Sequence, residues 1–183
     1  MKIGVLNIGQ ISPEIIERIK ENLSVFSNPT ITALPKTLPI PQEAFNSERQ
    51  QYHSTTILNK IRPLTEENKM LHRILGIIDV DLYVPELNFV FGEAECPGKA
   101  ALISLWRLKQ EFYEKPSNNE LLFERATKEA VHELGRTLGL MHCVNPFCVM
   151  YFSNSIFETD RKQSLFCGKC YQKVEEATNL MEE

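Results

Sequence analysis

The residues of this chain with the clearest chemical pattern lie between positions 132 and 142, in the segment HELGRTLGLMH. His132, Glu133, Gly139 and His142 match the zinc-site pattern H-E-x-x-H-x-x-G-x-x-H. Arg136 stands where the pattern has its middle histidine. In the complete pattern three imidazoles hold a zinc ion and the glutamate serves as general base. This stretch therefore predicts a hydrolytic metal site in which one ligand is replaced.

The spacing of these residues has a geometric reason in a helix. Residues four apart share one helix face, so positions 132 and 136 point to the same place, with Glu133 beside them. His142 comes ten residues after His132, which along a straight helix is about 15 Å. It can return to the same point only if the helix ends, and Gly139 suits that role because glycine adopts the left-handed conformation that terminates helices.

A second cluster of metal-binding residue types follows at once. Cys143, Cys148, Cys167 and Cys170 have the spacing C-x4-C-x18-C-x2-C, and four thiolates in two short-range pairs are what a tetrahedral structural zinc requires. The alternatives are disulfides or four unrelated buried thiols. Cys96 has no such neighbour, and we expect it to be a small half-buried thiol without a catalytic role.

Together these motifs resemble the archaemetzincin family of zinc metallopeptidases. The signature that carries the resemblance is the long histidine motif, an adjoining cysteine, a second cysteine with a methionine two residues later, and a distant C-x-x-C. In this chain these are His132 to His142, Cys143, Cys148, Met150, and Cys167 with Cys170. The resemblance extends upstream through Asp81-Leu82-Tyr83, Asn88 to Ala94, and Arg107-Leu108, so it covers most of the chain.

The resemblance implies roles for these residues. His132 and His142 would bind a catalytic zinc, and Glu133 would act as general base on the metal-activated water that attacks a peptide bond. Met150 would pack beneath the metal. The implied cofactor is zinc, and the implied partner is a peptide or protein substrate.

Arg136 disturbs this arrangement in two ways. Its guanidinium has no lone pair for a metal and would place a positive charge within a few ångströms of the ion. It also follows Glu133 by three residues, so we expect a salt bridge that holds the glutamate ionised. Peptidase activity is therefore expected to be impaired. Two alternatives stay open: an inactive pseudoprotease that binds peptides, and an interaction module held together by a structural zinc.

Length and composition limit the kind of protein further. A chain of 183 residues can bury the core of one domain, and 43% apolar with 24% charged residues is typical of soluble globular proteins. No apolar run approaches the roughly 20 residues that cross a bilayer, and a net charge of −4 gives no reason to expect nucleic acid as a partner. Five cysteines, four of them in metal spacing, favour a reducing, cytoplasmic location. The oligomeric state stays open.

The first half of the chain predicts alternating strands and helices. Residues 2–8 form a near-continuous apolar run, as in a strand buried on both faces, and Ser12-Pro13 marks the start of a helix that leads to a strand at 31–34. Such a unit implies parallel pairing of its two strands. We further expect a helix over 46–61 and strands over 81–84, 87–91 and 100–105.

A long helix is predicted to carry the histidine motif. The segment Ser117-Asn118-Asn119-Glu120 has the capping-box pattern that opens a helix. His132, Glu133 and Arg136 lie off the apolar stripe of this helix, which favours a cleft on that side. The stripe that should face the sheet consists of Phe123, Ala126, Ala130, Leu134 and Leu138. A closing helix is predicted over 171–181.

These elements predict an α/β fold, and the resemblance makes it a metzincin-like twisted mixed sheet with a long active-site helix and a small zinc-stabilised C-terminal subdomain. Residues 1–183 would form one domain, with an upper subdomain over 1–138 and a lower one over 139–183 that holds the Met-turn and the four-cysteine zinc. The cleft between them would bind an extended peptide, which could pair with the strand expected at 87–91 if that strand is the sheet edge.

Overall fold

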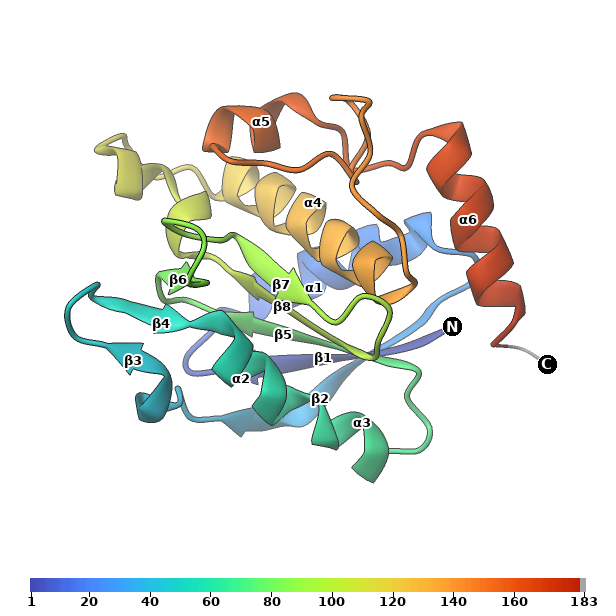
Figure 1. Cartoon of the computed structure of the whole chain (residues 1–183), viewed down its shortest axis with the longest axis horizontal. Coiled ribbons are helices and arrows are strands. Elements are labelled where there is room, and N and C mark those ends of the chain that lie inside the picture. The colour runs from blue at the N-terminus through green and yellow to red at the C-terminus, as the bar shows by residue number, and fades with distance from the viewer. Residues whose placement is uncertain (182–183) are drawn as a thin grey trace.

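A five-stranded sheet flanked by helices forms the centre of the molecule, as a computed structural model of residues 1–181 shows (Figure 1). Its strand order is β2-β1-β5-β8-β7. The first four strands in this order run parallel, whereas β7 pairs antiparallel with β8 and forms one edge, with β2 at the other. The strands are β1 Lys2–Ile8, β2 Thr30–Leu38, β5 Arg73–Ile78, β7 Gly92–Ala94 and β8 Ala100–Ser104. The predicted strand–helix–strand opening with parallel pairing is confirmed.

A second, smaller sheet joins β3 Phe45–Asn46, β4 Gln51–His53 and β6 Leu82–Tyr83. The predicted helix over 46–61 is therefore wrong in its first half, because only α2 Ser54–Ile61 is helical. The Asn46 side chain accepts the backbone N–H groups of Glu48 and Arg49, which closes a turn in place of a helix. β4 then pairs with β6, a partner some thirty residues away that no local pattern could reveal.

The helices cover both faces of the large sheet (Figure 1). α1 Pro13–Asn22 and α4 Asn119–Thr137 pack on one face, while α2 and α3 Pro63–Glu67 pack on the other. Each face has its own buried apolar cluster, so the sheet is covered on both sides, as its parallel strands require. α5 Ile156–Arg161 and α6 Gly168–Asn179 follow α4 in the chain. Within residues 1–181, none of the helices has the length and apolarity that a membrane span demands.

The edge strand lies later in the chain than predicted. Residues 87–91 form no regular strand, and Val90 makes only an isolated bridge with Leu82. Regular pairing begins at Gly92, opposite Ile103 of β8. Apolar, β-prone side chains favoured the earlier segment, but the register with β8 decides which residues become the strand. The sheet edge that borders α4 is thus β7.

Candidate active-site cleft and metal centre

The histidine motif lies on the last two turns of α4 and on the loop that follows. The Asn118 side chain accepts the N–H of Leu121 at 3.0 Å, so the N-cap is Asn118, one residue after the expected cap at Ser117, and the helix begins at Asn119. At the other end Gly139 has a φ of +88°, and its N–H donates to the Arg136 carbonyl at 2.8 Å. The predicted helix stop at this glycine is confirmed, and the chain turns back beneath the helix.

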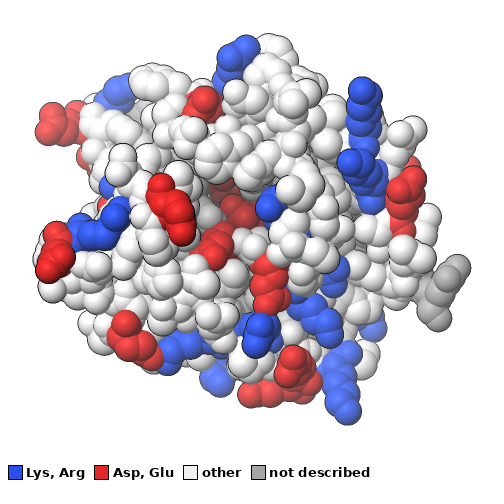
Figure 2. Space-filling view, in the orientation of Figure 1, with Lys and Arg blue, Asp and Glu red and all other residues white. Residues whose placement is uncertain are grey.

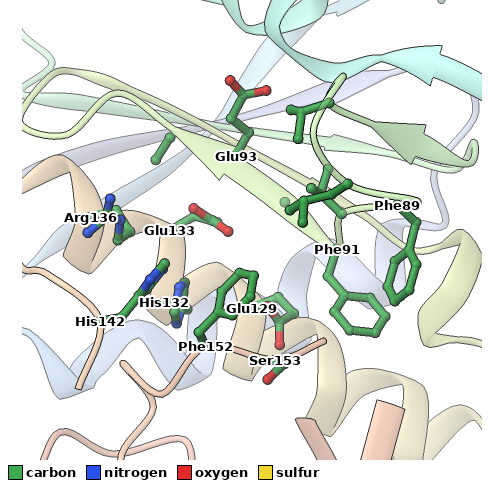
Figure 3. A pocket seen from close by; sticks show the side chains of 15 residues that line it. Phe89, Phe91, Glu93, Glu129, His132, Glu133, Arg136, His142, Phe152 and Ser153 are labelled. Atoms are coloured by element: carbon green, nitrogen blue, oxygen red, sulfur yellow. The ribbon is translucent and has the colours of Figure 1, made fainter. Parts of the chain in front are cut away.

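This reversal brings His132 and His142 together. Their ring centroids lie 5.4 Å apart with an interplanar angle of 29°, and Phe152 packs against the ring of His142 at 4.8 Å (Figure 3). The Nδ1–H of His132 donates to the Val149 carbonyl at 2.8 Å, which leaves Nε2 as the atom that can bind a ligand. Burial holds the pKa of His132 well below its usual value, so its imidazole is neutral.

Glu133 borders a cavity of about 180 Å³ between α4 and β7. Figure 2 shows a hollow in the centre of this face, with acidic side chains recessed in it and a basic one beside them. Burial, followed by the neighbouring Glu129 carboxylate, raises the pKa of Glu133 to about 8. β7 approaches this side chain through Gly92, where a Cβ atom would lie 2.8 Å from the Glu133 Cγ. The glycine therefore permits the strand to border the cleft.

Arg136 is half-buried at the end of α4. Its Nη1 donates to the Leu140 carbonyl at 2.7 Å and contacts the Met141 sulfur at 3.6 Å. The carbonyls at the C-terminal end of a helix attract a cation, which gives the guanidinium a partner close to its own backbone.

The predicted salt bridge between Arg136 and Glu133 does not form. None of the ion pairs among residues 1–181 joins the two side chains, and Figure 3 shows the Glu133 carboxyl pointing along the cleft away from Arg136. The expectation that Arg136 holds Glu133 ionised is therefore wrong. Arg136 lowers the pKa of Glu133 only as a minor influence, which burial and Glu129 outweigh.

The residues of this cleft do not fit a catalytic zinc of the three-ligand kind. Two imidazoles, those of His132 and His142, converge there, and the guanidinium in the third position cannot coordinate. In the part of the chain that the structure describes, the only group of three or more His, Cys, Asp or Glu side chains whose ligand atoms come together is a cysteine cluster. That Arg136 prevents zinc binding in the cleft stays a prediction.

That cluster consists of Cys143, Cys148, Cys167 and Cys170, whose sulfur atoms all lie within 4.8 Å of one another. The distance between the sulfurs of Cys143 and Cys167 is 3.8 Å, far from a disulfide and close to the roughly 3.8 Å between two ligands of a tetrahedral zinc with Zn–S bonds of about 2.3 Å. The residues present therefore fit a structural zinc. Cys96 is half-buried and lies outside the cluster, as expected.

Backbone N–H groups donate hydrogen bonds to the sulfur atoms of this cluster, which favours the thiolate form that binds a cation. The Cys167 N–H donates to the Cys148 sulfur at 3.3 Å, and the Asn145 N–H donates to the Cys143 sulfur at 3.4 Å. The backbone N–H of Cys170 lowers the pKa of the Cys167 thiol to about 7. Burial raises the pKa of Cys148 and Cys170, so complete deprotonation of the set requires a positive ion among the four sulfurs.

Met150 connects the two clusters. Its side chain is fully buried beneath α4 at Gly135, where a Cβ atom would lie 2.6 Å from the methionine sulfur. Its carbonyl accepts the N–H of Cys143 at 2.9 Å. The segment after the helix is thus fixed against the turn that carries the histidines, and the close approach depends on the glycine.

Sequence reasoning missed a buried ion pair next to the cleft. Lys162 and Glu129 are almost entirely inaccessible, with Nζ and Oε1 2.9 Å apart, although Nζ is not aligned for a hydrogen bond. The Thr159 hydroxyl donates to the same carboxylate oxygen at 3.1 Å. Glu129 could have been noticed because it precedes Glu133 by four residues on one helix face. Its partner lies 33 residues later, in a segment without periodic pattern.

Comparison with known proteins agrees with the fold and with the motif. Residues 2–176 match the model of peptidase family M54. The chain is 46% identical over 177 residues to the archaemetzincin of Methanocaldococcus jannaschii. The aligned region covers 96% of this chain and 94% of that protein.

Solved structures give the same result. The crystal structure of archaemetzincin from Methanopyrus kandleri superposes with a TM-score of 0.83 at 34% identity, covering 98% of this chain and 96% of that one. The archaemetzincin of Archaeoglobus fulgidus, complexed with malonate, gives 0.80 at 38% identity, with 94% and 99% covered.

The fold and the motif are thus those of the metallopeptidases of the metzincin type. The chain belongs to peptidase family M54, the archaemetzincins. This confirms the resemblance, the predicted metzincin-like α/β fold and zinc as the cofactor to expect.

Proposed function

We propose that this chain is an archaemetzincin that keeps the peptide-binding cleft of its family but hydrolyses peptide bonds poorly or not at all. The observation that carries the proposal is the position of Arg136, whose side chain fills the place of the middle histidine and is held there by the Leu140 carbonyl. Catalytic zinc depends on three protein ligands, and this cleft supplies two imidazoles and a positive charge.

Several features support a peptide as the ligand. The cavity lies beside β7, the antiparallel edge of the large sheet, and an extended peptide can add to such an edge by main-chain hydrogen bonds. Aromatic side chains of Phe89, Phe91 and Phe152 line the cavity and offer contacts for apolar side chains. A module with a structural zinc alone would have no use for this lined cavity next to Glu133.

In the same proposal the four-cysteine zinc is structural. Residues 139–183, of which 182 and 183 lie outside the described residues, form a lower subdomain whose order depends on that ion, and residues 1–138 form the upper subdomain. The fully buried Met150 and the four converging sulfurs support this division of roles.

The test is hydrolysis of a quenched-fluorescent peptide library by the parent, by Arg136→His, and by Arg136→His combined with Glu133→Ala. We expect no chelator-sensitive hydrolysis by the parent. Arg136→His restores a donor on the helix face of His132, so zinc-dependent hydrolysis is expected to emerge and to disappear again in the double variant. Chelator-sensitive hydrolysis by the parent that Glu133→Ala abolishes would instead establish it as an active peptidase.

A further inference from the structure

Four arginines of this protein donate hydrogen bonds from the same edge of the guanidinium, formed by Nε and Nη2. Arg107 donates from Nε and Nη2 to the two carboxylate oxygens of Asp81, at 2.6 and 2.7 Å, and Arg125 donates from the same two atoms to Asp160 at the same distances. Arg49 and Arg73 also use Nε and Nη2, with side-chain and carbonyl oxygens as acceptors. This edge of the guanidinium is the one that matches a carboxylate with two parallel hydrogen bonds.

Arg136 is different. Its hydrogen bonds come from Nη1, and within residues 1–181 no group accepts from its Nε or Nη2. No carboxylate pairs with it in that range either. Its nitrogens are not among the buried atoms without a partner, and the residue lines the cavity. The unused edge of this cavity-lining residue is therefore accessible.

The acidic residues of the cavity do not fill this edge. Glu93 accepts hydrogen bonds from Ser54 and from Thr55, the latter at 2.8 Å, and its carboxylate is turned toward α2. Glu129 is paired with Lys162 in the protein interior. The carboxyl of Glu133 points along the cleft away from Arg136 (Figure 3). A fixed positive charge thus stands in a partly enclosed site beside the sheet edge without a counter-charge from the described chain.

We propose that the free Nε and Nη2 edge of Arg136 binds the C-terminal carboxylate of a peptide, so that this cleft recognises peptide ends and not the interior of a chain. The proposal rests on the proposed function, namely that the cleft holds peptides. A metal ion at this position would bind the carbonyl oxygen of a peptide bond and the water that attacks it. A guanidinium in its place is suited instead to a carboxylate that already ends a peptide chain.

The surroundings favour a chain terminus over an acidic side chain. A terminal carboxylate is attached to a main chain that can pair with β7 and to a side chain that can enter the phenylalanine-lined part of the cavity. A cavity of about 180 Å³ has room for one residue of this kind. We therefore expect an apolar C-terminal residue in the ligand.

The test compares three probes in nuclear magnetic resonance titrations of the intact, zinc-loaded chain: acetyl-Ala-Ala-Phe with a free carboxylate, the same peptide as its C-terminal amide, and acetyl-Ala-Phe-Glu amide. The parent is expected to bind the free acid about 10-fold more tightly than either amide, in keeping with a bidentate charge-assisted pair. Arg136→Gln should remove that preference, and Arg136→Lys, which keeps the charge but lacks the fork, should retain part of it. Arg62→Gln, the same change on the exposed surface, is the matched control and should leave the preference intact.

The outcomes separate this proposal from the one on which it rests. Equal affinity of the parent for acid and amide would overturn carboxylate recognition while leaving peptide binding in place. Tight binding of the glutamate-containing amide would show that the carboxylate comes from a side chain, which overturns recognition of the terminus. Failure of all three probes to bind at millimolar concentration would contradict peptide binding itself.

Discussion

The cysteine cluster and the histidine cleft lie on the same stretch of chain, yet only one of them has a complete ligand set. Four sulfurs converge within 4.8 Å, whereas the cleft brings together two imidazoles and a guanidinium. The segment after α4 adds buried side chains to the main core, and in the proposed function the four-cysteine zinc orders the rest of it. α4 is held by packing against β7 and β8 and does not need a metal to fold.

This difference shows why a substitution at the catalytic position can be tolerated. Arg136 stands in the last turn of a helix, where free carbonyls stabilise a cation, and its Nη1 bonds to the Leu140 carbonyl. Under the proposed function, an arginine in place of the histidine removes a zinc ligand while the helix keeps its packing. Loss of a cysteine from the other cluster would, under the same proposal, remove an interaction that stabilises the fold.

The largest effect is therefore expected from the cysteines. Cys167→Ser should abolish tight zinc binding and lower the melting temperature by on the order of 10 °C, because one lost thiolate leaves an incomplete tetrahedral site. Zinc analysis and calorimetry would measure both. Cys96→Ser, a change of the same kind outside the cluster, should affect neither, and a parent-like melting curve for Cys167→Ser would refute the structural role of the zinc.

A smaller loss of stability is expected when the buried ion pair beside the cleft is broken. Lys162→Met leaves the Glu129 carboxylate buried without its partner, which typically costs about 3–5 kcal/mol in the free energy of unfolding. Urea denaturation would measure this cost. Adding Glu129→Gln should recover most of it, since the double variant no longer buries a lone charge. If both variants unfold like the parent, the pair does not support the cleft.

Glu133 in the cleft is also expected to make the free energy of unfolding depend on pH. Burial, and then the Glu129 carboxylate, raise the pKa of Glu133 from its unfolded value near 4.5 to about 8, so the folded chain holds a proton that the unfolded chain has released between these pH values. The contribution of Glu133 to stability is then fully present below pH 4.5 and declines as the pH rises toward 8, by at most about 1.4 kcal/mol per pH unit.

Glu133→Gln should accordingly match the parent in stability near pH 4 and exceed it by about 2–3 kcal/mol at pH 7. Denaturation curves at pH 4, 5, 6 and 7 would show the difference growing. A constant difference across this range would mean that Glu133 is ionised in the folded chain, in contrast to the account given for the cleft.

The sequence predicted the parts of this molecule that local pattern determines. β1, α1, α4 and the turn at Gly139 follow from apolar runs, helical spacing and terminating residues, and the cysteine spacing predicted a cluster that the geometry confirms. The parts it misplaced depend on distant partners: β7 takes its register from β8, and β4 pairs with β6.

In the cleft, too, some features could be predicted from local spacing and others could not. Helical spacing placed His132, Glu133 and Arg136 together, and the glycine turn brought back His142. Spacing also suggested a salt bridge between Glu133 and Arg136, and this failed because the guanidinium found a carbonyl partner at the helix end. The Val149 carbonyl that orients His132 and the Lys162 that pairs with Glu129 come from a segment without periodic pattern, so no spacing rule could assign them.

The contrast between the two clusters is tested most directly by the zinc content of the purified chain, measured by elemental analysis and located by anomalous scattering at the zinc edge. We expect one zinc per chain, bound by Cys143, Cys148, Cys167 and Cys170. Arg136→His, which removes the positive charge and adds a third imidazole, should bind two. Two zinc ions in the parent, one of them held by His132 and His142, would contradict the account.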